Sequence, residues 1–272
     1  MDIKEYIVIA IAINAGKTIL GIYNSDVDLK LDQSPLTLAD RKSHYIIKNK
    51  ISQTKLPILS KEGRKVSYQH RRIWSKYWLV DPLDGTKEFI KKNGEFTVNI
   101  ALIENSKPVM GVVYSPVLDI LYVGAEELSA FRIKQASELL KYLTLINDWR
   151  NYAESLPLLS TINIFRIVVS RSHLTKETLE FINSIRDQHS EIELISKGSS
   201  LKLCLIAEGY ADIYPRFAPT MEWDTATGHA IINATEGKVC QADENNKESL
   251  LNPKFIAGAF NVDEKRINNH GR

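Results

Sequence analysis

The sequence has few cysteines, almost no net charge and no long hydrophobic run, and each of these features limits what the protein can be. Its 272 residues include only two cysteines, Cys204 and Cys240, both in apolar stretches. We expect small core residues rather than a disulfide or a metal pair, and therefore a reducing compartment. The net charge of +2 gives no electrostatic case for nucleic-acid or membrane binding. Any selectivity for anions must therefore be local.

The apolar run from Tyr6 to Ile13 is too short to span a bilayer. It follows Asp2, Lys4 and Glu5 rather than a basic segment, so we expect no signal peptide and no integral membrane segment. The expected location is the cytoplasm, with peripheral contact at the inner membrane as an alternative.

Hydrophobic spacing predicts an α+β half followed by an α/β half. Residues 1–155 are predicted to place helices against a largely antiparallel sheet, and residues 156–272 to alternate strands and helices. The expected helices are 2–23, 34–51, 174–188 and 198–209, and the expected strands are 97–104, 108–114, 119–124, 164–169 and 191–196. The boundary falls in residues 128–159, which carry no clear signal.

Residues 77–87 combine an apolar strand with two closely spaced acids, Asp81 and Asp84, at its exit. Buried carboxylates this close repel each other and lose hydration, so they need a cation or a shared proton. Magnesium suits them, because it prefers carboxylates, water and phosphate oxygens. Pro82 fixes the turn and can aim the Leu83 carbonyl inward as a further ligand.

Gly85 and Thr86 complete this turn. Gly85 allows an anion to approach the backbone N–H groups, and the Thr86 hydroxyl can orient a water molecule. The alternative is an ordinary Asp-Pro-x-Asp-Gly turn between two strands, and turn chemistry alone does not exclude it. The chain has no Cys-x5-Arg signature, so we expect no covalent phosphoenzyme.

Other polar residues lie where helices are expected to begin. Asp40 follows a threonine by three positions, as in a capping box. Ser199 or Ser200 can cap the helix that carries Lys202, and Asp224 precedes an apolar helix. Local capping explains each of these residues, and the free N–H groups of a helix start also suit an anion.

The motif at residues 81–86, preceded by Trp78 and Val80, resembles the signature of the magnesium-dependent, lithium-sensitive phosphatases that include inositol monophosphatase and fructose-1,6-bisphosphatase. Residues 87–90 and 93–103 narrow the resemblance to the CysQ-type 3'(2'),5'-bisphosphate nucleotidases. Matching segments recur from about Ser34 to Pro253. The resemblance implies a layered αβαβα sandwich of the sugar-phosphatase type and two or three Mg2+ ions. It also implies hydrolysis of the 3'-phosphate of adenosine 3',5'-bisphosphate to AMP in sulfur metabolism.

The resemblance also implies roles for individual residues. The implied metal ligands are Asp81, the carbonyl of Leu83, Asp84 and Asp224. The implied catalytic pair is Asp40 and Thr86, in which the acid hydrogen-bonds the threonine and the two polarise the attacking water. The implied substrate-binding residues are Gly85, Thr86, His173, Ser199, Lys202, Arg216 and Asp224. A single histidine is commonly a surface or core residue, but the position of His173 after a predicted strand matches the family.

Residue 61 departs from the resemblance. The family typically carries Ser-Glu-Glu where this chain has Ser60-Lys61-Glu62, and the first glutamate is a metal ligand. An ammonium about 4 Å from a divalent cation costs about 8 kcal/mol at an effective dielectric near 20, so Lys61 cannot simply take the place of that ligand. Three outcomes are open: Lys61 turns out to solvent, Glu62 moves to replace the ligand, or one metal site is weakened or empty.

Three functions follow from this evidence. The first is the nucleotidase, favoured because a second phosphate-binding cluster distinguishes bisphosphorylated nucleotides from inositol phosphates. The second is a phosphatase for inositol phosphate, sugar phosphate or the sulfated nucleotide. The third is a catalytically impaired nucleotide-binding protein, suggested by Lys61. The expected partner is a small nucleotide bisphosphate, and the sequence leaves the oligomeric state unknown.

Overall fold

The computed structural model describes residues 4–25, 35–143, 148–158, 164–172, 174–186, 188–189, 191–240 and 245–260. The helices are α1 (Glu5–Tyr23), α2 (Pro35–Ile51), α3 (Tyr68–Arg71), α4 (Thr86–Ile90), α5 (Ala136–Leu139), α6 (Lys176–Arg186), α7 (Leu201–Ala207) and α8 (Glu222–Asn233), with short 3-10 turns at Ser52–Thr54 and Trp149–Tyr152. The strands are β1 (Ile58–Ser60), β2 (Lys76–Asp84), β3 (Thr97–Glu104), β4 (Lys107–Ser115), β5 (Ile120–Ala125), β6 (Ser129–Lys134), β7 (Glu154–Leu156), β8 (Phe165–Ser170), β9 (Ile192–Lys197), β10 (Ile213–Arg216), β11 (Lys238–Cys240) and β12 (Phe255–Gly258).

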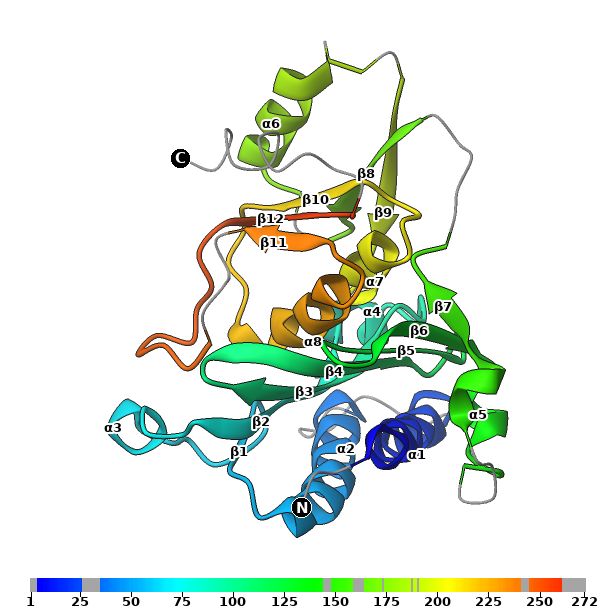
Figure 1. The fold of residues 1–272 in the computed structure, drawn as a ribbon, viewed down its shortest axis with the longest axis vertical. Coiled ribbons are helices and arrows are strands. Elements are labelled where there is room, and N and C mark those ends of the chain that lie inside the picture. The colour runs from blue at the N-terminus through cyan, green and yellow to red at the C-terminus, as the bar shows by residue number, and fades with distance from the viewer. Residues whose placement is uncertain are drawn as a thin grey trace.

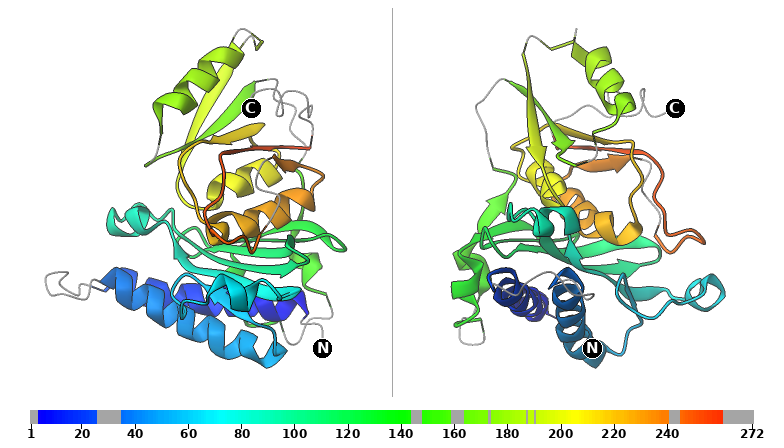
Figure 2. Two further views of the ribbon diagram at one scale, coloured as in Figure 1. Left: turned by 90° about the vertical axis from the view of Figure 1, so that its left-hand side faces the viewer. Right: turned by 180° about the vertical axis from the view of Figure 1, so that it is seen from behind.

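The molecule is built in five layers, as the resemblance implies. Helices α1 and α2 cover one face of a seven-stranded sheet, and α7 and α8 lie between that sheet and a five-stranded one (Figure 1). Helix α6 covers the outer face of the second sheet (Figure 2), where its buried side chains share a core cluster with β8, β10 and β12. The αβαβα prediction is therefore confirmed.

The first sheet has the order β1-β2-β3-β4-β5-β6-β7 and is antiparallel throughout except for the parallel pair β1–β2. Helices on both faces cover it, which explains why its strands are apolar on both sides rather than alternating. The second sheet has the order β11-β12-β10-β8-β9, with β8, β9 and β10 parallel and β11 and β12 antiparallel. The predictions of an antiparallel first sheet and a mixed second half are confirmed.

Helix α1 has the length and mean hydropathy, 1.6, of a candidate membrane span, but half of it is buried within the protein. Its buried side chains pack into the main core together with those of α2 and the first sheet. This burial accounts for its apolar composition, because a helix that is covered on several sides needs few polar positions.

The division into residues 1–155 and 156–272 stays a prediction. The strands of the two sheets separate near that point, since β7 ends at Leu156 and β8 begins at Phe165. Helix α8, from the second half of the chain, nevertheless contacts β2, β3, β4 and β5 of the first sheet.

Glycines allow α8 to approach its neighbours closely. A Cβ atom at Gly111 of β4 would lie 2.2 Å from the carbonyl oxygen of Thr227 in α8. On the other side of α8, a Cβ at Gly228 would lie 2.5 Å from the side chain of Leu203 in α7. The helix therefore packs closely against the backbone of β4 on one side and against the Leu203 side chain of α7 on the other.

We expect Gly111→Ala to lower the free energy of unfolding by about 1–3 kcal/mol or more, because the new methyl group meets backbone rather than a movable side chain. A suitable control is Gly21→Ala, an exposed helical site with nothing within 4 Å of the added Cβ. That change should stabilise the protein by up to about 1 kcal/mol through helix propensity. Urea denaturation of both variants measures the two effects, and an unchanged midpoint for Gly111→Ala would contradict the packing argument.

Candidate functional site

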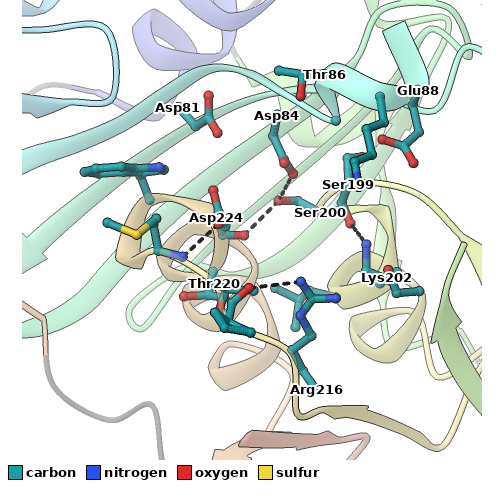
Figure 3. Close-up of a pocket in the computed structure, with 18 of the residues that line it drawn as sticks. Asp81, Asp84, Thr86, Glu88, Ser199, Ser200, Lys202, Arg216, Thr220 and Asp224 are labelled. Carbon is teal, nitrogen blue, oxygen red and sulfur yellow. Dashed lines mark hydrogen bonds between the residues drawn. The ribbon is translucent and has the colours of Figure 1, made fainter. Parts of the chain in front are cut away.

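A cavity of about 430 Å³ lies where the exit of β2 meets the starts of α7 and α8. Its lining includes Asp81, Asp84 and Asp224 as well as Lys202 and Arg216. Figure 3 shows the three carboxylates near one another at one end of the view and the two cations at the other. The fold thus brings together acids and bases that are up to 143 positions apart in the chain (224 minus 81).

Strand β2 reaches Asp84 through a bulge rather than ending at Asp81. Asp81 pairs with Asn99 and Asp84 with Thr97, so the bulged strand has one extra residue between the two pairs. The Leu83 N–H donates to Asp81 Oδ1 at 3.1 Å, and the Ser43 hydroxyl donates to the Pro82 carbonyl at 2.8 Å. Both acids therefore lie at the end of one bulged strand, in agreement with the prediction that Asp81 and Asp84 sit at the strand's exit.

Asp81, Asp84 and Asp224 each place a carboxylate oxygen within 4.8 Å of the others. Asp81 is only 1% exposed, and burial raises its pKa well above the ordinary value despite the opposing charge of Lys61. Burial and the neighbouring Asp84 raise the pKa of Asp224 to about 6. Carboxylates in such a group favour either protonation or a bound cation. Their all-oxygen donor set fits a hard divalent metal.

Lys61 points into this acidic group. Its ammonium donates to the Leu83 carbonyl at 2.7 Å and to Asp81 Oδ1 at 3.1 Å. It also lies 3.5 Å from Asp40 Oδ2. The predicted outcome in which Lys61 turns out to solvent is therefore wrong. Within the described residues, Glu62 is not part of the converging acid group, so it does not replace the missing ligand here.

Asp40, at 4% exposure, is buried beside this group on α2. Burial raises its pKa to about 6, and Lys61 opposes the increase. In the described part of the chain, Oδ1 of Asp40 has no hydrogen-bond partner and Oδ2 lies 3.5 Å from the Lys61 ammonium. Neither oxygen forms the expected bond with Thr86. The Asp40 side chain faces Lys61 instead, and the water-orienting role of the Asp40–Thr86 pair stays a prediction. The proposed capping partner of Asp40 at residue 37 has a side chain outside the described residues.

Gly85 adopts a φ of +86° at the start of α4. A Cβ there would lie 3.1 Å from the carbonyl oxygen of Glu95 and from the Cβ of Ser199. Glycine is therefore required both by the left-handed conformation and by the close approach of the loop that carries Ser199.

Lys202 and Arg216, each only 8% exposed, form the basic end of the cavity. Lys202 donates to the Ser199 carbonyl at 2.6 Å, and Arg216 donates to the Pro219 carbonyl at 3.1 Å. Burial lowers the pKa of Lys202 to about 8, and the like charge of Arg216 adds to the decrease while Asp84 opposes it. Arg216 Nε is buried with no partner among the described residues. Two buried cations with spare donors make this end of the cavity suited to an anion.

Ser200 is the N-cap residue of α7, as one of the two predicted alternatives had it, but its side chain makes no cap hydrogen bond. The hydroxyl instead lies 3.0 Å from Asp84 Oδ2 and 3.1 Å from the Asp224 carbonyl, and it accepts from Asn99 Nδ2 at 2.8 Å. Ser199 does not cap the helix either: it has a φ of +45° and a buried hydroxyl without a partner in the described part of the chain.

Asp224 is the third residue of α8 rather than its cap. Met221 is the N-cap, and its N–H donates to Asp224 Oδ2 at 2.8 Å. The capping prediction was therefore correct about a helix start but wrong about the position. This bond holds one carboxylate oxygen of Asp224 and fixes the orientation of the group.

Asn99, Ser200 and Glu95 were missed as supporting residues. Asn99 is fully buried in the structure. In the sequence it is an amide within an apolar strand, and that pattern is the signal that could have identified it. Glu95 accepts from Arg171 at 2.8 Å and from the Gly198 N–H at 2.8 Å, so it holds the loop before α7. His173 lies outside the described residues, and its predicted contact with the nucleotide stays a prediction.

Comparison with known protein families, sequences and structures identifies relatives of this chain. Residues 3–270 match the inositol monophosphatase family. The chain is 42% identical to the 3'(2'),5'-bisphosphate nucleotidase CysQ of Shigella flexneri, over 92% of this chain and 97% of that protein. It is 43% identical to the CysQ of Salmonella typhimurium, over 90% and 95% of the two chains.

Among solved structures, the crystal structure of CysQ from Bacteroides thetaiotaomicron is similar, with a TM-score of 0.86 and 48% identity over 94% of this chain and 97% of that chain. Its title describes that protein as a bacterial member of the inositol monophosphatase family. These matches confirm the resemblance seen in the turn at residues 81–86. The chain belongs to the inositol monophosphatase family.

Proposed function

We propose that this protein is a magnesium-dependent 3'(2'),5'-bisphosphate nucleotidase that hydrolyses the 3'-phosphate of adenosine 3',5'-bisphosphate to give AMP and phosphate. The observation that carries the proposal is the placement of Asp81, Asp84 and Asp224 at one end of the cavity and of Lys202 and Arg216 at the other (Figure 3). A substrate with one phosphate at each end fits this division, and the CysQ relatives are named for such bisphosphates.

At the acidic end, Asp81, Asp84 and Asp224 would hold magnesium, with the Leu83 carbonyl beside them. Magnesium, when bound, supplies positive charge to the phosphoryl oxygens and to the leaving oxygen. Water attacks the phosphorus of the 3'-phosphate, and the bond to the 3'-oxygen breaks as that oxygen gains a proton. We assign the orientation of the water to Thr86 with Asp40, and contact with the scissile phosphate to the backbone at Gly85.

At the basic end, Lys202 and Arg216 would bind the second phosphate, with Ser199 beside them and His173 as a further candidate. Arg216 can bind a phosphate through two parallel N–H bonds, which makes it the stronger orienting group. Both cations are already buried and positioned by backbone carbonyls, so little side-chain entropy is lost on binding. The substrate replaces water at charges that have no carboxylate partner in the described part of the chain.

Inositol and sugar phosphates have no second phosphate for the basic end, so they use only part of the cavity. The impaired nucleotide-binding alternative is motivated by Lys61, but Asp81, Asp84 and Asp224 retain a converging set of ligands. We therefore favour an active nucleotidase. Cys204 is a free cysteine, which agrees with the proposed cytoplasmic location, and nothing in the described residues supports peripheral contact with a membrane.

We expect Arg216→Gln to reduce kcat/KM for adenosine 3',5'-bisphosphate by about 10- to 100-fold, because a hydrogen bond to a charged group contributes about 1.5–3 kcal/mol. Hydrolysis of adenosine 3'-phosphate, which lacks the second phosphate, should change little. The matched control is Lys176→Gln, which removes one positive charge from the exposed face of α6. The assay is phosphate release in the presence of magnesium by the wild type, Arg216→Gln and Lys176→Gln. EDTA should abolish this release. Equal losses on both substrates would contradict the assignment of Arg216.

The pH dependence of kcat/KM should follow the protonation of the Lys202 side chain. Its pKa is lowered to about 8, so the side chain is charged below that pH and becomes neutral as the pH rises through it. We expect kcat/KM for the bisphosphate to fall about tenfold per pH unit above pH 8, while the value for adenosine 3'-phosphate stays flat over the same range. Lys202→Arg should remove the decline, because arginine stays charged. A decline of the same size in Lys202→Arg would assign it to another group.

A further inference from the structure

Lys61 occupies the position of a cation rather than that of a ligand. Its ammonium contacts the Leu83 carbonyl at 2.7 Å and Asp81 Oδ1 at 3.1 Å, two of the oxygen atoms expected to hold a metal. Asp40 Oδ2 lies 3.5 Å away on a third side. An ammonium has three N–H donors, and these three oxygens surround it.

The backbone places Lys61 there. Strand β1 runs parallel to β2 with Ser60 opposite Val80, and the Lys61 N–H continues the ladder by donating to the Val80 carbonyl at 3.1 Å. Lys61 is therefore the next residue along β1, beside Asp81. Its side chain is only 24% exposed, so most of its length is packed in the site rather than in solvent.

The charge of Lys61 also matches the net charge of a glutamate with one bound divalent ion. A lysine side chain is ordinarily protonated at neutral pH, and carboxylate oxygens of Asp81 and Asp40 lie 3.1 and 3.5 Å from the Lys61 ammonium. The side chain therefore carries one positive charge in the folded protein. A glutamate at this position together with one divalent ion also carries a net charge of +1. The lysine alone therefore supplies the same net charge as that pair.

We propose that the Lys61 ammonium permanently fills one of the cation positions of this site, so that the protein binds one divalent ion fewer than it would with glutamate at residue 61. The remaining metal position is formed by Asp81, Asp84 and Asp224, each of which places a carboxylate oxygen within 4.8 Å of the others. The inference rests on the proposed metal-dependent function, because it concerns the cations of the same site. It differs from the impaired-protein alternative, since the lysine replaces a charge instead of merely removing a ligand.

Counting bound Mn2+ tests the proposal without substrate. Electron paramagnetic resonance of free Mn2+ during titration gives the number of ions bound by the wild type and by Lys61→Glu. We expect Lys61→Glu to bind one additional ion per chain. The control is Lys65→Glu, which makes the same change of charge at an exposed residue four positions away and should bind the same number as the wild type. Equal numbers for the wild type and Lys61→Glu, or an extra ion in Lys65→Glu, would overturn the proposal.

A second measurement covers the case in which Lys61→Glu folds poorly. Lys61→Met keeps the length of the side chain and removes its charge, so the carboxylates around it lose their fixed cation. Its Tm in EDTA should lie below that of the wild type, and magnesium should raise its Tm by more than it raises the wild-type Tm. An equal rise in Tm for the two proteins would show that Lys61 does not act as a cation in the site.

Turnover of adenosine 3',5'-bisphosphate separates this inference from the proposed function. An inactive wild type with one ion fewer than Lys61→Glu would contradict the nucleotidase assignment and support the role of Lys61. An active wild type that binds the same number of ions as Lys61→Glu would support the nucleotidase assignment and contradict the role of Lys61.

Discussion

The repulsion among buried carboxylates is the constraint on which the rest of the site depends. Asp81, Asp84 and Asp224 converge within 4.8 Å from two segments that meet only in the folded protein. Burial of uncompensated charges is costly, so the fold supplies hydrogen bonds and positive charge. Ser200 contacts Asp84, the backbone at Met221 donates to Asp224, and Lys61 donates to Asp81. Each acid thus has its own specific partner.

The same constraint explains why the layers pack so closely around α8. The position of Asp224 depends on the first turn of this helix, and Gly111 and Gly228 let the backbone approach β4 and α7. A displacement of α8 would increase the separation between Asp224 and Asp84 and weaken both metal binding and the Ser200 bridge. The close packing of α8 against β4 and α7 therefore determines how near the Asp224 carboxylate lies to the Asp84 carboxylate.

The sequence revealed residues whose chemistry is contained in a continuous motif, and it was weaker where a contact depends on distant segments. Asp81 and Asp84 were recognisable because the strand, the proline turn and the acids lie within a few positions. Ser200 was interpreted as a helix cap because capping is a local explanation. Its contact with Asp84 crosses 116 positions and depends on how the two sheets face each other. The layered fold followed from the resemblance and from hydrophobic spacing, because both describe whole elements rather than single contacts.

Lys61 shows how a correct electrostatic argument can still lead to an incomplete set of outcomes. A lysine cannot share a position with a divalent ion, and the third expected outcome, a weakened or empty metal site, already allowed for the loss of that ion. None of the three outcomes stated that the ammonium itself is the cation. In the structure the ammonium donates to Asp81 and to the Leu83 carbonyl and lies 3.5 Å from Asp40 Oδ2. Lys61 therefore acts on charge and geometry within the acidic group, while the proposed function assigns contact with the phosphate to the remaining metal position and to the turn at Gly85.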